Sequence, residues 1–193
     1  MHRILVTDGI VLSKRTLGEA HTLVSVLTEG HGLLRAKATS TRAEVSKLRY
    51  GTELMTRARF SFVQGKYEWK LTGVERISRE FTSPLSRNRV AAGRIAKLLL
   101  RLIRGEEQGG ELFATVAEGL SLLSRAENEN ASASIECVLV LRILSHLGYL
   151  PHTPALAPFV EKDFSSAELA LEAQASRAFL IRTINESLMQ TGL

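Results

Sequence analysis

The chain has 193 residues, of which 45% are hydrophobic and 6% aromatic. This length fits one large domain or two small ones, and the apolar fraction excludes a chain that is disordered throughout. The single Cys137 excludes an internal disulfide framework and a zinc site built from several cysteines. Because the five histidines show no metal-ligand spacing either, we expect no metal site and no cofactor.

The positive charge is concentrated in the first part of the sequence. Residues 1–80 contain 14 lysines and arginines against 8 aspartates and glutamates, whereas residues 81–193 contain 11 against 12. The excess behind the formal net charge of +5 therefore belongs to the first segment. A basic domain beside a neutral one favours a polyanionic ligand, although a basic surface that only keeps the protein soluble is the alternative.

The sequence also predicts a location. The apolar run at the start is too short for a signal peptide, and Asp8 interrupts it. Since the sequence has no run of about 18 apolar residues, we expect no membrane span and a cytoplasmic protein.

Strands are predicted in the first 80 residues, where short β-type segments are separated by turns that contain glycine. The segments are Gly9–Ser13, His21–Thr28, Leu33–Thr39, Leu54–Phe62 and a run from Tyr67 to Leu71. Five short strands in so few residues favour a small closed barrel over a sandwich, which needs about seven.

The alternation assigns a face to each side chain of the later strands. The apolar residues Leu34, Ala36, Ala38, Ala58, Phe60 and Phe62 share the inner faces of the third and fourth strands. The outer faces then carry four cations, Arg35, Lys37, Arg57 and Arg59. Tyr67, Trp69 and Leu71 share a face of the fifth strand, which favours the barrel core over a base-stacking role.

The connector Ser40–Gly51 is the most basic one in the sequence, and it forms either a short helix or a mobile loop. Binding to phosphates needs cations along a groove, and OB barrels also stack bases on exposed aromatic rings. The candidate nucleic-acid-binding residues are therefore Arg35, Lys37, Arg42, Lys47, Arg49, Tyr50, Arg57 and Arg59.

Helical spacing replaces the alternation after Phe81. Helices are predicted between Ser83 and Gly105, over Leu112–Leu123, over the buried segment Ile135–Leu147, and more weakly over Ser165–Ala173 and Ala175–Gln190. We expect Ala126–Ser134 to be the loosest part and His152–Phe159 to be irregular. The fold class is α+β, with an N-terminal five-stranded OB-type barrel at residues 1–80 followed by an all-α helical bundle domain at residues 81–193.

The helical domain carries a cationic stripe at helical spacing, formed by Arg94, Lys97, Arg101 and Arg104. A solvated helix face is the ordinary explanation of such a row. The stripe could also extend a nucleic-acid path or hold an acidic peptide, and with Arg142 it forms the candidate partner-binding set.

Signals of catalysis are missing from the sequence, which has no phosphate-binding loop of the Gly-Lys-Ser/Thr type, no G-x-S-x-G and no H-E-x-x-H. Asp8 and Glu19 are the carboxylates closest to a pair, but both are expected at strand ends or turns. We therefore predict that the protein is not an enzyme.

Two segments resemble the RecO family. Thr7–Arg42 (TDGIVLSKRTLGEAHTLVSVLTEGHGLLRAKATSTR) is similar to the start of that family, and Ser46–Arg49 is similar to the Ser-Lys connector that follows. Leu141–Pro151 (LRILSHLGYLP) is similar to the family's leucine-rich helix, which ends in Leu-Gly-Tyr-x-Pro.

The resemblance implies an N-terminal OB fold, a C-terminal helical bundle and a recombination mediator in bacterial DNA repair. It implies binding to single- and double-stranded DNA, annealing of complementary strands, and loading of a recombinase onto single-stranded DNA coated by its binding protein. The implied partners are RecR and the C-terminal tail of the single-stranded DNA-binding protein, and the implied location is the cytoplasm, in association with the nucleoid.

One feature departs from the family. Many members carry a four-cysteine zinc module after Leu-Gly-Tyr-x-Pro, but His152–Phe159 contains no cysteine, so no zinc site is expected here.

The alternative function is a protein-interaction adaptor, whose barrel and helical groove bind protein partners without direct contact to DNA.

Overall fold

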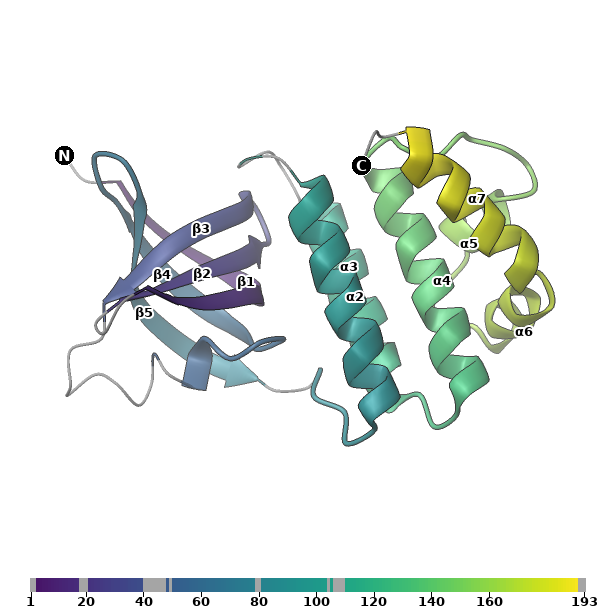
Figure 1. The fold of residues 1–193 in the computed structure, drawn as a ribbon, viewed down its shortest axis with the longest axis horizontal. Coiled ribbons are helices and arrows are strands. Elements are labelled where there is room, and N and C mark those ends of the chain that lie inside the picture. Colours follow the sequence, from purple (N-terminus) through teal and green to yellow (C-terminus); the bar gives the residue numbers. More distant parts are fainter. Residues whose placement is uncertain are drawn as a thin grey trace. The chain divides into compact units, whose positions relative to one another are not determined.

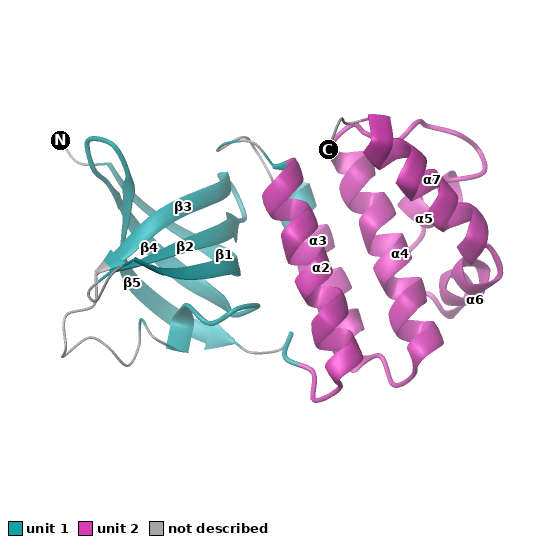
Figure 2. Cartoon of the chain, in the orientation of Figure 1, with its two compact units in different colours: residues 1–82, 103–113 teal, residues 83–102, 114–193 magenta. Residues whose placement is uncertain are grey.

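The computed structural model describes residues 3–17, 21–39, 48, 50–78, 81–103, 105 and 110–190. The chain divides into two compact units (Figure 2). Unit 1 contains residues 1–82 and 103–113, and unit 2 contains residues 83–102 and 114–193.

Unit 1 is built on a closed barrel (Figure 1). Its strands are β1 (Ile4–Leu17), β2 (His21–Thr28), β3 (Gly32–Thr39), β4 (Arg57–Gln64) and β5 (Trp69–Ser78). The strand order around the barrel is β1-β2-β3-β5-β4, and β3 pairs with β5 in parallel while the other neighbours are antiparallel. The described part of the chain therefore confirms the predicted fold class, a five-stranded OB-type barrel followed by helices.

The barrel core follows the alternation of the sequence. Val26, Leu34, Ala36, Phe60 and Phe62 are completely buried, and the rings of Phe60 and Phe62 stack with their centroids 5.9 Å apart. Trp69 and Leu71 are also buried, as predicted for the fifth strand.

Tyr67 differs from the prediction. Its side chain is 86% exposed, because β5 begins only at Trp69 and residues 65–68 form the turn that follows β4. The backbone N–H of Gly65 donates to the carbonyl of Glu68 at 2.9 Å and closes this turn. Placing Tyr67 in the barrel core was therefore wrong.

β1 is longer than the predicted segment Gly9–Ser13. Its first half, Ile4–Ile10, pairs with β4, whereas Gly9–Leu17 pairs with β2. The register shifts between Val11 and Ser13, which marks a bulge, and a bulge interrupts the period of two by which a strand is recognised. The bulge lies within the predicted segment, and before it the exposed positions are themselves apolar, since Ile4 is 69% and Val6 50% exposed. The first half of the strand therefore shows no apolar–polar alternation in the sequence.

Unit 2 is helical in its described residues (Figure 1). The helices are α2 (Ser86–Leu102), α3 (Gly110–Arg125, which enters unit 2 at Ala114), α4 (Glu129–His146), α5 (Ala157–Glu161), α6 (Ala167–Ala175) and α7 (Arg177–Gln190). Helix α4 contacts α2, α5, α6 and α7, and its residues Leu139, Leu141, Ile143 and Leu144 are completely buried. The prediction of a buried third helix is confirmed. Within the described residues, no helix combines the length and the apolar content that crossing a membrane requires.

Of the two predictions about loops in this unit, one was wrong and the other held in part. Helix α4 begins at Glu129, inside the segment Ala126–Ser134 that was expected to be loose, because the side chain of Asn128 accepts a hydrogen bond from the N–H of Ala131. The segment His152–Phe159 was expected to be irregular, and residues 152–156 are neither helix nor strand, but α5 begins at Ala157. Pro158 sits in the first turn of α5, where a missing N–H has no cost.

Arg142 fastens the segment after α4 to that helix. Its guanidinium donates to the carbonyl of Phe159 at 3.0 Å and to the carbonyl of Lys162, and it lies 4.4 Å from the centroid of the Phe164 ring. The residue is only 8% exposed, and burial lowers the pKa of its guanidinium. Its hydrogen bonds therefore join α4 to the chain at α5 and just beyond it.

Two helical glycines differ in the space around them, so substitution by alanine should have opposite effects on stability. A Cβ on Gly119 in α3 would lie 2.6 Å from Cδ1 of the fully buried Leu139, whereas a Cβ on Gly93 in α2 would meet nothing within 4 Å. We expect Gly119→Ala to lose about 1–2 kcal/mol of unfolding free energy, because overpacking outweighs the gain in helix propensity. Gly93→Ala should gain up to about 1 kcal/mol, and urea titrations followed by circular dichroism measure both. Equal stability of the two variants would contradict the packing of α3 on α4.

Removing the guanidinium of Arg142 should destabilise unit 2. Arg142→Met keeps an apolar side chain beside Phe164 but leaves the carbonyls of Phe159 and Lys162 without their donors, so we expect a loss of about 2–4 kcal/mol. The exposed Arg101 in α2 is the matched control, and Arg101→Met should change the unfolding free energy by less than about 0.5 kcal/mol. A loss of the same size in both variants would show that Arg142 acts only through its charge.

Candidate nucleic-acid interface

The four predicted outer cations do lie on the outside of the barrel, but the strand register divides them into two settings. Arg35 and Arg59 are exposed, whereas Lys37 and Arg57 are partly buried. Arg35 and Lys37 belong to β3, and Arg57 and Arg59 belong to β4, with β5 lying between these two strands in the barrel.

Around Lys37, the register brings further cations onto the same outer face. Lys37 is directly opposite Lys70 on β5, and on its other side it is opposite Leu23 on β2, which is opposite Arg15 on β1. Arg35 lies two residues before Lys37 on β3, so it points the same way. We call the surface formed by Arg15, Arg35, Lys37 and Lys70 the basic face.

The basic face extends across four neighbouring strands. With strands about 4.8 Å apart, the backbone positions of Lys37 and Lys70 are separated by about 5 Å, and those of Arg15 and Lys37 by about 10 Å. Arg15, Arg35 and Lys70 are exposed. Nζ of Lys37 lies 3.8 Å from a carboxylate oxygen of Glu68, an ion pair whose partners are 30% and 49% exposed. Such a pair contributes little in water, so Glu68 reduces the charge of the face without cancelling it.

The turn between β4 and β5 borders the basic face, since Lys70 is the second residue of β5. In this turn, Nζ of Lys66 lies over the ring of Tyr67, 5.0 Å from its centroid. Tyr67 and Lys66 therefore lie three and four residues before Lys70 in the chain. Glu68, in the same turn, forms the ion pair with Lys37.

The cations of β4 have a different environment. Arg59 lies directly opposite Asp8 on β1 and directly opposite Glu75 on β5, so an acidic residue flanks it on each side. Arg57 lies 5.8 Å from the centroid of the Phe113 ring, which also belongs to unit 1. Glu75 is five residues beyond Lys70 on β5, or about 17 Å along the strand, so Arg59 is well separated from the basic face.

Part of the predicted site lies outside the described residues. Three residues of the connector lie outside the described part of the chain, namely Arg42, Lys47 and Arg49. Tyr50 is described and 55% exposed, and its neighbour Gly51 packs so closely on β5 that a Cβ would lie 2.3 Å from Cγ1 of Val74.

The predicted partner-binding residues of unit 2 also differ from one another. Arg94 forms two hydrogen bonds of 2.6 Å with the carboxylate of Glu136, which raise the pKa of its guanidinium. Lys97 and Arg101 are exposed on α2, and Arg104 lies outside the described residues. Because Arg142 is buried and its guanidinium bonds to backbone carbonyls, it belongs to the interior of the unit and not to a partner surface.

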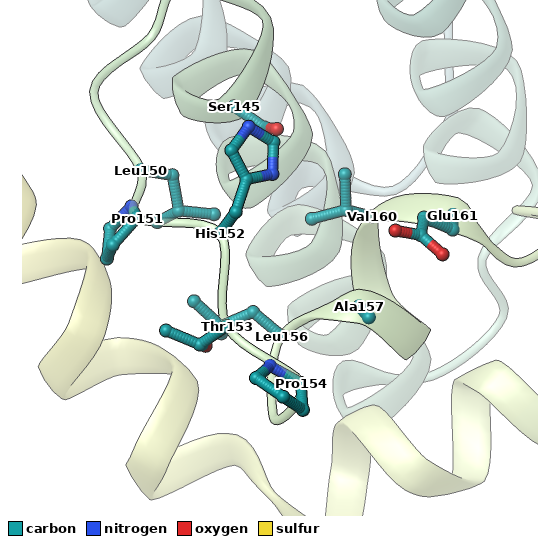
Figure 3. Close-up of a pocket in the computed structure, with 10 residues that line it drawn as sticks. All are labelled: Ser145, Leu150, Pro151, His152, Thr153, Pro154, Leu156, Ala157, Val160 and Glu161. Atoms are coloured by element: carbon teal, nitrogen blue, oxygen red, sulfur yellow. The ribbon is translucent and has the colours of Figure 1, made fainter.

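A cavity of about 410 Å³ lies at the end of α4 (Figure 3). Apolar residues such as Leu150, Leu156 and Val160 line it, together with the titratable residues His152 and Glu161. The described residues that line it include no lysine or arginine, so it does not extend the cationic surface. In the part of the chain that the structure describes, no group of three or more histidine, cysteine, aspartate and glutamate residues is placed to hold a metal ion.

Sequence reasoning missed two members of the basic face. Lys70 alternates with Trp69 and Leu71, so its outward direction is visible in the sequence, but its pairing with Lys37 depends on the barrel closing. Arg15 lies beyond the end of the predicted first strand, and only the hairpin of β1 with β2 turns it toward β3.

Comparisons with known proteins agree with this architecture. Residues 1–78 match the family model described as "Recombination protein O N terminal". This range covers the five strands of the barrel.

Curated relatives match a larger part of the chain. Proteins named "DNA repair protein RecO" are 32% identical over 152 residues in Heliobacterium modesticaldum, 31% over 156 residues in Moorella thermoacetica and 35% over 162 residues in a Synechococcus strain. These matches cover 77%, 78% and 78% of this chain, but 53%, 55% and 53% of the relatives. The chain therefore spans about half the length of the curated relatives it matches.

The family model, the curated relatives and the observed barrel all agree with the resemblance found in the sequence. The chain belongs to the RecO family.

Proposed function

We propose that this protein acts in DNA repair as a DNA-binding recombination mediator, without catalysis of its own. The relatives are named for DNA repair, and the observation that carries the proposal is the basic face. Arg15, Lys37 and Lys70 share one row across the barrel, and Arg35 stands beside that row. The cations of the face lie on β1, β3 and β5 and flank β2, and OB folds bind oligonucleotides on the face of their second and third strands.

Counterion release is the physical basis of the proposed binding. A nucleic-acid strand carries condensed cations, and a protein that neutralises its phosphates with lysine or arginine releases them. The four cations of the basic face point outward from the rigid strands of the barrel. Since a cation held on a strand loses little freedom on binding, this arrangement supports phosphate contacts better than a mobile tail would.

The same charge supports annealing of complementary strands. Two single strands repel each other through their phosphates, and a cationic surface that holds both lowers this repulsion, so pairing can nucleate. In the proposed mechanism the protein then assists recombinase loading on single-stranded DNA coated by its binding protein. Contact with double-stranded DNA is part of the proposal, because phosphate contacts do not depend on unpaired bases.

The remaining predicted residues enter the proposal unequally. Arg42, Lys47, Arg49 and Tyr50 of the connector remain candidates for DNA contact. Arg57 and Arg59 should contribute less than the basic face, because Arg59 lies between Asp8 and Glu75 and Arg57 lies against Phe113.

Protein partners are the second part of the proposal. We propose that RecR and the C-terminal tail of the single-stranded DNA-binding protein bind this chain, and that the exposed Lys97 and Arg101 of α2 attract the acidic tail. Arg94 should contribute less, since Glu136 already holds its guanidinium.

A salt series tests the basic face. Each cation removed from a phosphate contact should flatten the plot of log K against log salt by about 0.7 on single-stranded DNA. We expect this change for Arg15→Ala, Arg35→Ala, Lys37→Ala and Lys70→Ala, measured by anisotropy of a labelled oligonucleotide. Arg182→Ala on α7 removes the same charge from an exposed position of unit 2 and should leave the slope unchanged. An unchanged slope in the quadruple variant would refute the proposal, and the adaptor function would replace it if protein partners still bound.

Charge reversal on α2 tests the partner surface. The double variant Lys97→Glu with Arg101→Glu should weaken binding of a peptide with the acidic tail sequence by about fivefold at low salt, as expected for exposed charges worth about 1 kcal/mol in total. Isothermal titration calorimetry with Arg182→Glu as the control measures the effect. The proposal for this surface fails if Arg182→Glu weakens peptide binding as much as the double variant does.

A further inference from the structure

The turn between β4 and β5 holds an aromatic ring away from the protein. Tyr67 is 86% exposed, whereas Trp69, two residues later, is 5% exposed and points into the barrel. The hydrogen bond between the N–H of Gly65 and the carbonyl of Glu68 closes the turn around Tyr67. The ring is therefore presented by an ordered turn, with its surface open to a ligand.

One cation lies over this ring, and the neighbouring residues of the chain connect it to the basic face. Nζ of Lys66 lies 5.0 Å from its centroid, and the next residue, Glu68, forms the ion pair with Lys37. Lys70, three residues after Tyr67, is directly opposite Lys37. A strand whose phosphates lie on Lys37 and Lys70 would thus bring its bases toward the exposed ring of Tyr67, one face of which Lys66 approaches.

We propose that Tyr67 is the base-stacking platform of the basic face and that it makes this site bind single-stranded DNA more tightly than a duplex. The inference rests on the proposed function, because it assumes that the basic face holds the phosphates. Stacking on an aromatic side chain needs an unpaired base, since in a duplex the faces of each base are covered by its neighbours. The cations act on the phosphates of either form, so the ring is the part of the site that can distinguish the two forms.

The other aromatic residues near the barrel fit this role less well. Trp69 is buried in the core beside Phe62, with the two ring centroids 6.5 Å apart. Tyr50 is exposed, but the adjacent Gly51 packs on Val74 in the middle of β5. Tyr67 lies two residues before the start of β5, at the end of the strand that carries Lys70.

The test compares three labelled ligands of equal length at low salt: oligothymidylate, a DNA duplex, and a strand of abasic deoxyribose phosphates. Stacking of one base contributes roughly 5- to 150-fold in affinity, so Tyr67→Ala should weaken oligothymidylate binding by about tenfold or more. Affinity for the duplex and for the abasic strand should stay within about twofold of the unchanged protein, because neither ligand offers a base face.

Two further variants separate the ring from its bulk. Tyr67→Phe keeps the ring and should retain the affinity for oligothymidylate, whereas Tyr67→Leu keeps apolar bulk and should lose it as Tyr67→Ala does. Leu54→Ala, which truncates a half-exposed apolar side chain of unit 1, is the control and should bind all three ligands normally.

The outcomes distinguish this inference from the proposed function. The stacking role would be overturned if Tyr67→Ala lowered the affinity for all three ligands equally. It would also be overturned if that variant bound oligothymidylate with full affinity. If Lys37→Ala and Lys70→Ala still weakened binding in that case, the proposed function would stand alone. If the unchanged protein bound none of the ligands at low salt, both would fall together.

Discussion

The parallel pairing of β3 with β5 is the constraint on which the rest of unit 1 depends. It is short, joining Ala36 to Trp69, Lys37 to Lys70 and Ala38 to Leu71, yet it closes the barrel and leaves no free edge between these strands. Because side chains alternate along a strand, the same three pairs bury Trp69 and Leu71 inside and bring two lysines together outside. The core and the basic face therefore arise from one register.

The sequence predicts what local periodicity controls and misses what the register controls. The inward direction of four side chains follows from alternation alone, and all four are buried in the barrel core: Leu34, Ala36, Phe60 and Phe62. The juxtaposition of Lys37 with Lys70 joins segments that are far apart in the chain, as does the position of Arg59 between two acidic residues. Local alternation does not determine which strands become neighbours. The sequence therefore predicts one group of outer cations, although the barrel places Arg57 and Arg59 apart from Lys37 and Lys70.

The helical unit shows the same division between local and long-range information. The apolar pattern of α4 predicts its burial, but its start was missed because Asn128, a good N-cap, resembles loop composition. Arg142 was taken for a surface cation, although a single charge within an apolar helix is itself a signal of an internal partner. Its two partners are backbone carbonyls of the segment Phe159–Lys162, which composition does not reveal.

If phosphates lie on the basic face, bound DNA shields its lysines from chemical modification, which lysine footprinting measures. The protein is treated with an amine-reactive reagent with and without saturating oligothymidylate, and the modification of each lysine is measured by mass spectrometry. We predict that Lys37 and Lys70 lose reactivity when DNA is bound, while the exposed Lys97 of α2 reacts as before. Unchanged reactivity of Lys37 and Lys70 in a saturated complex would contradict it.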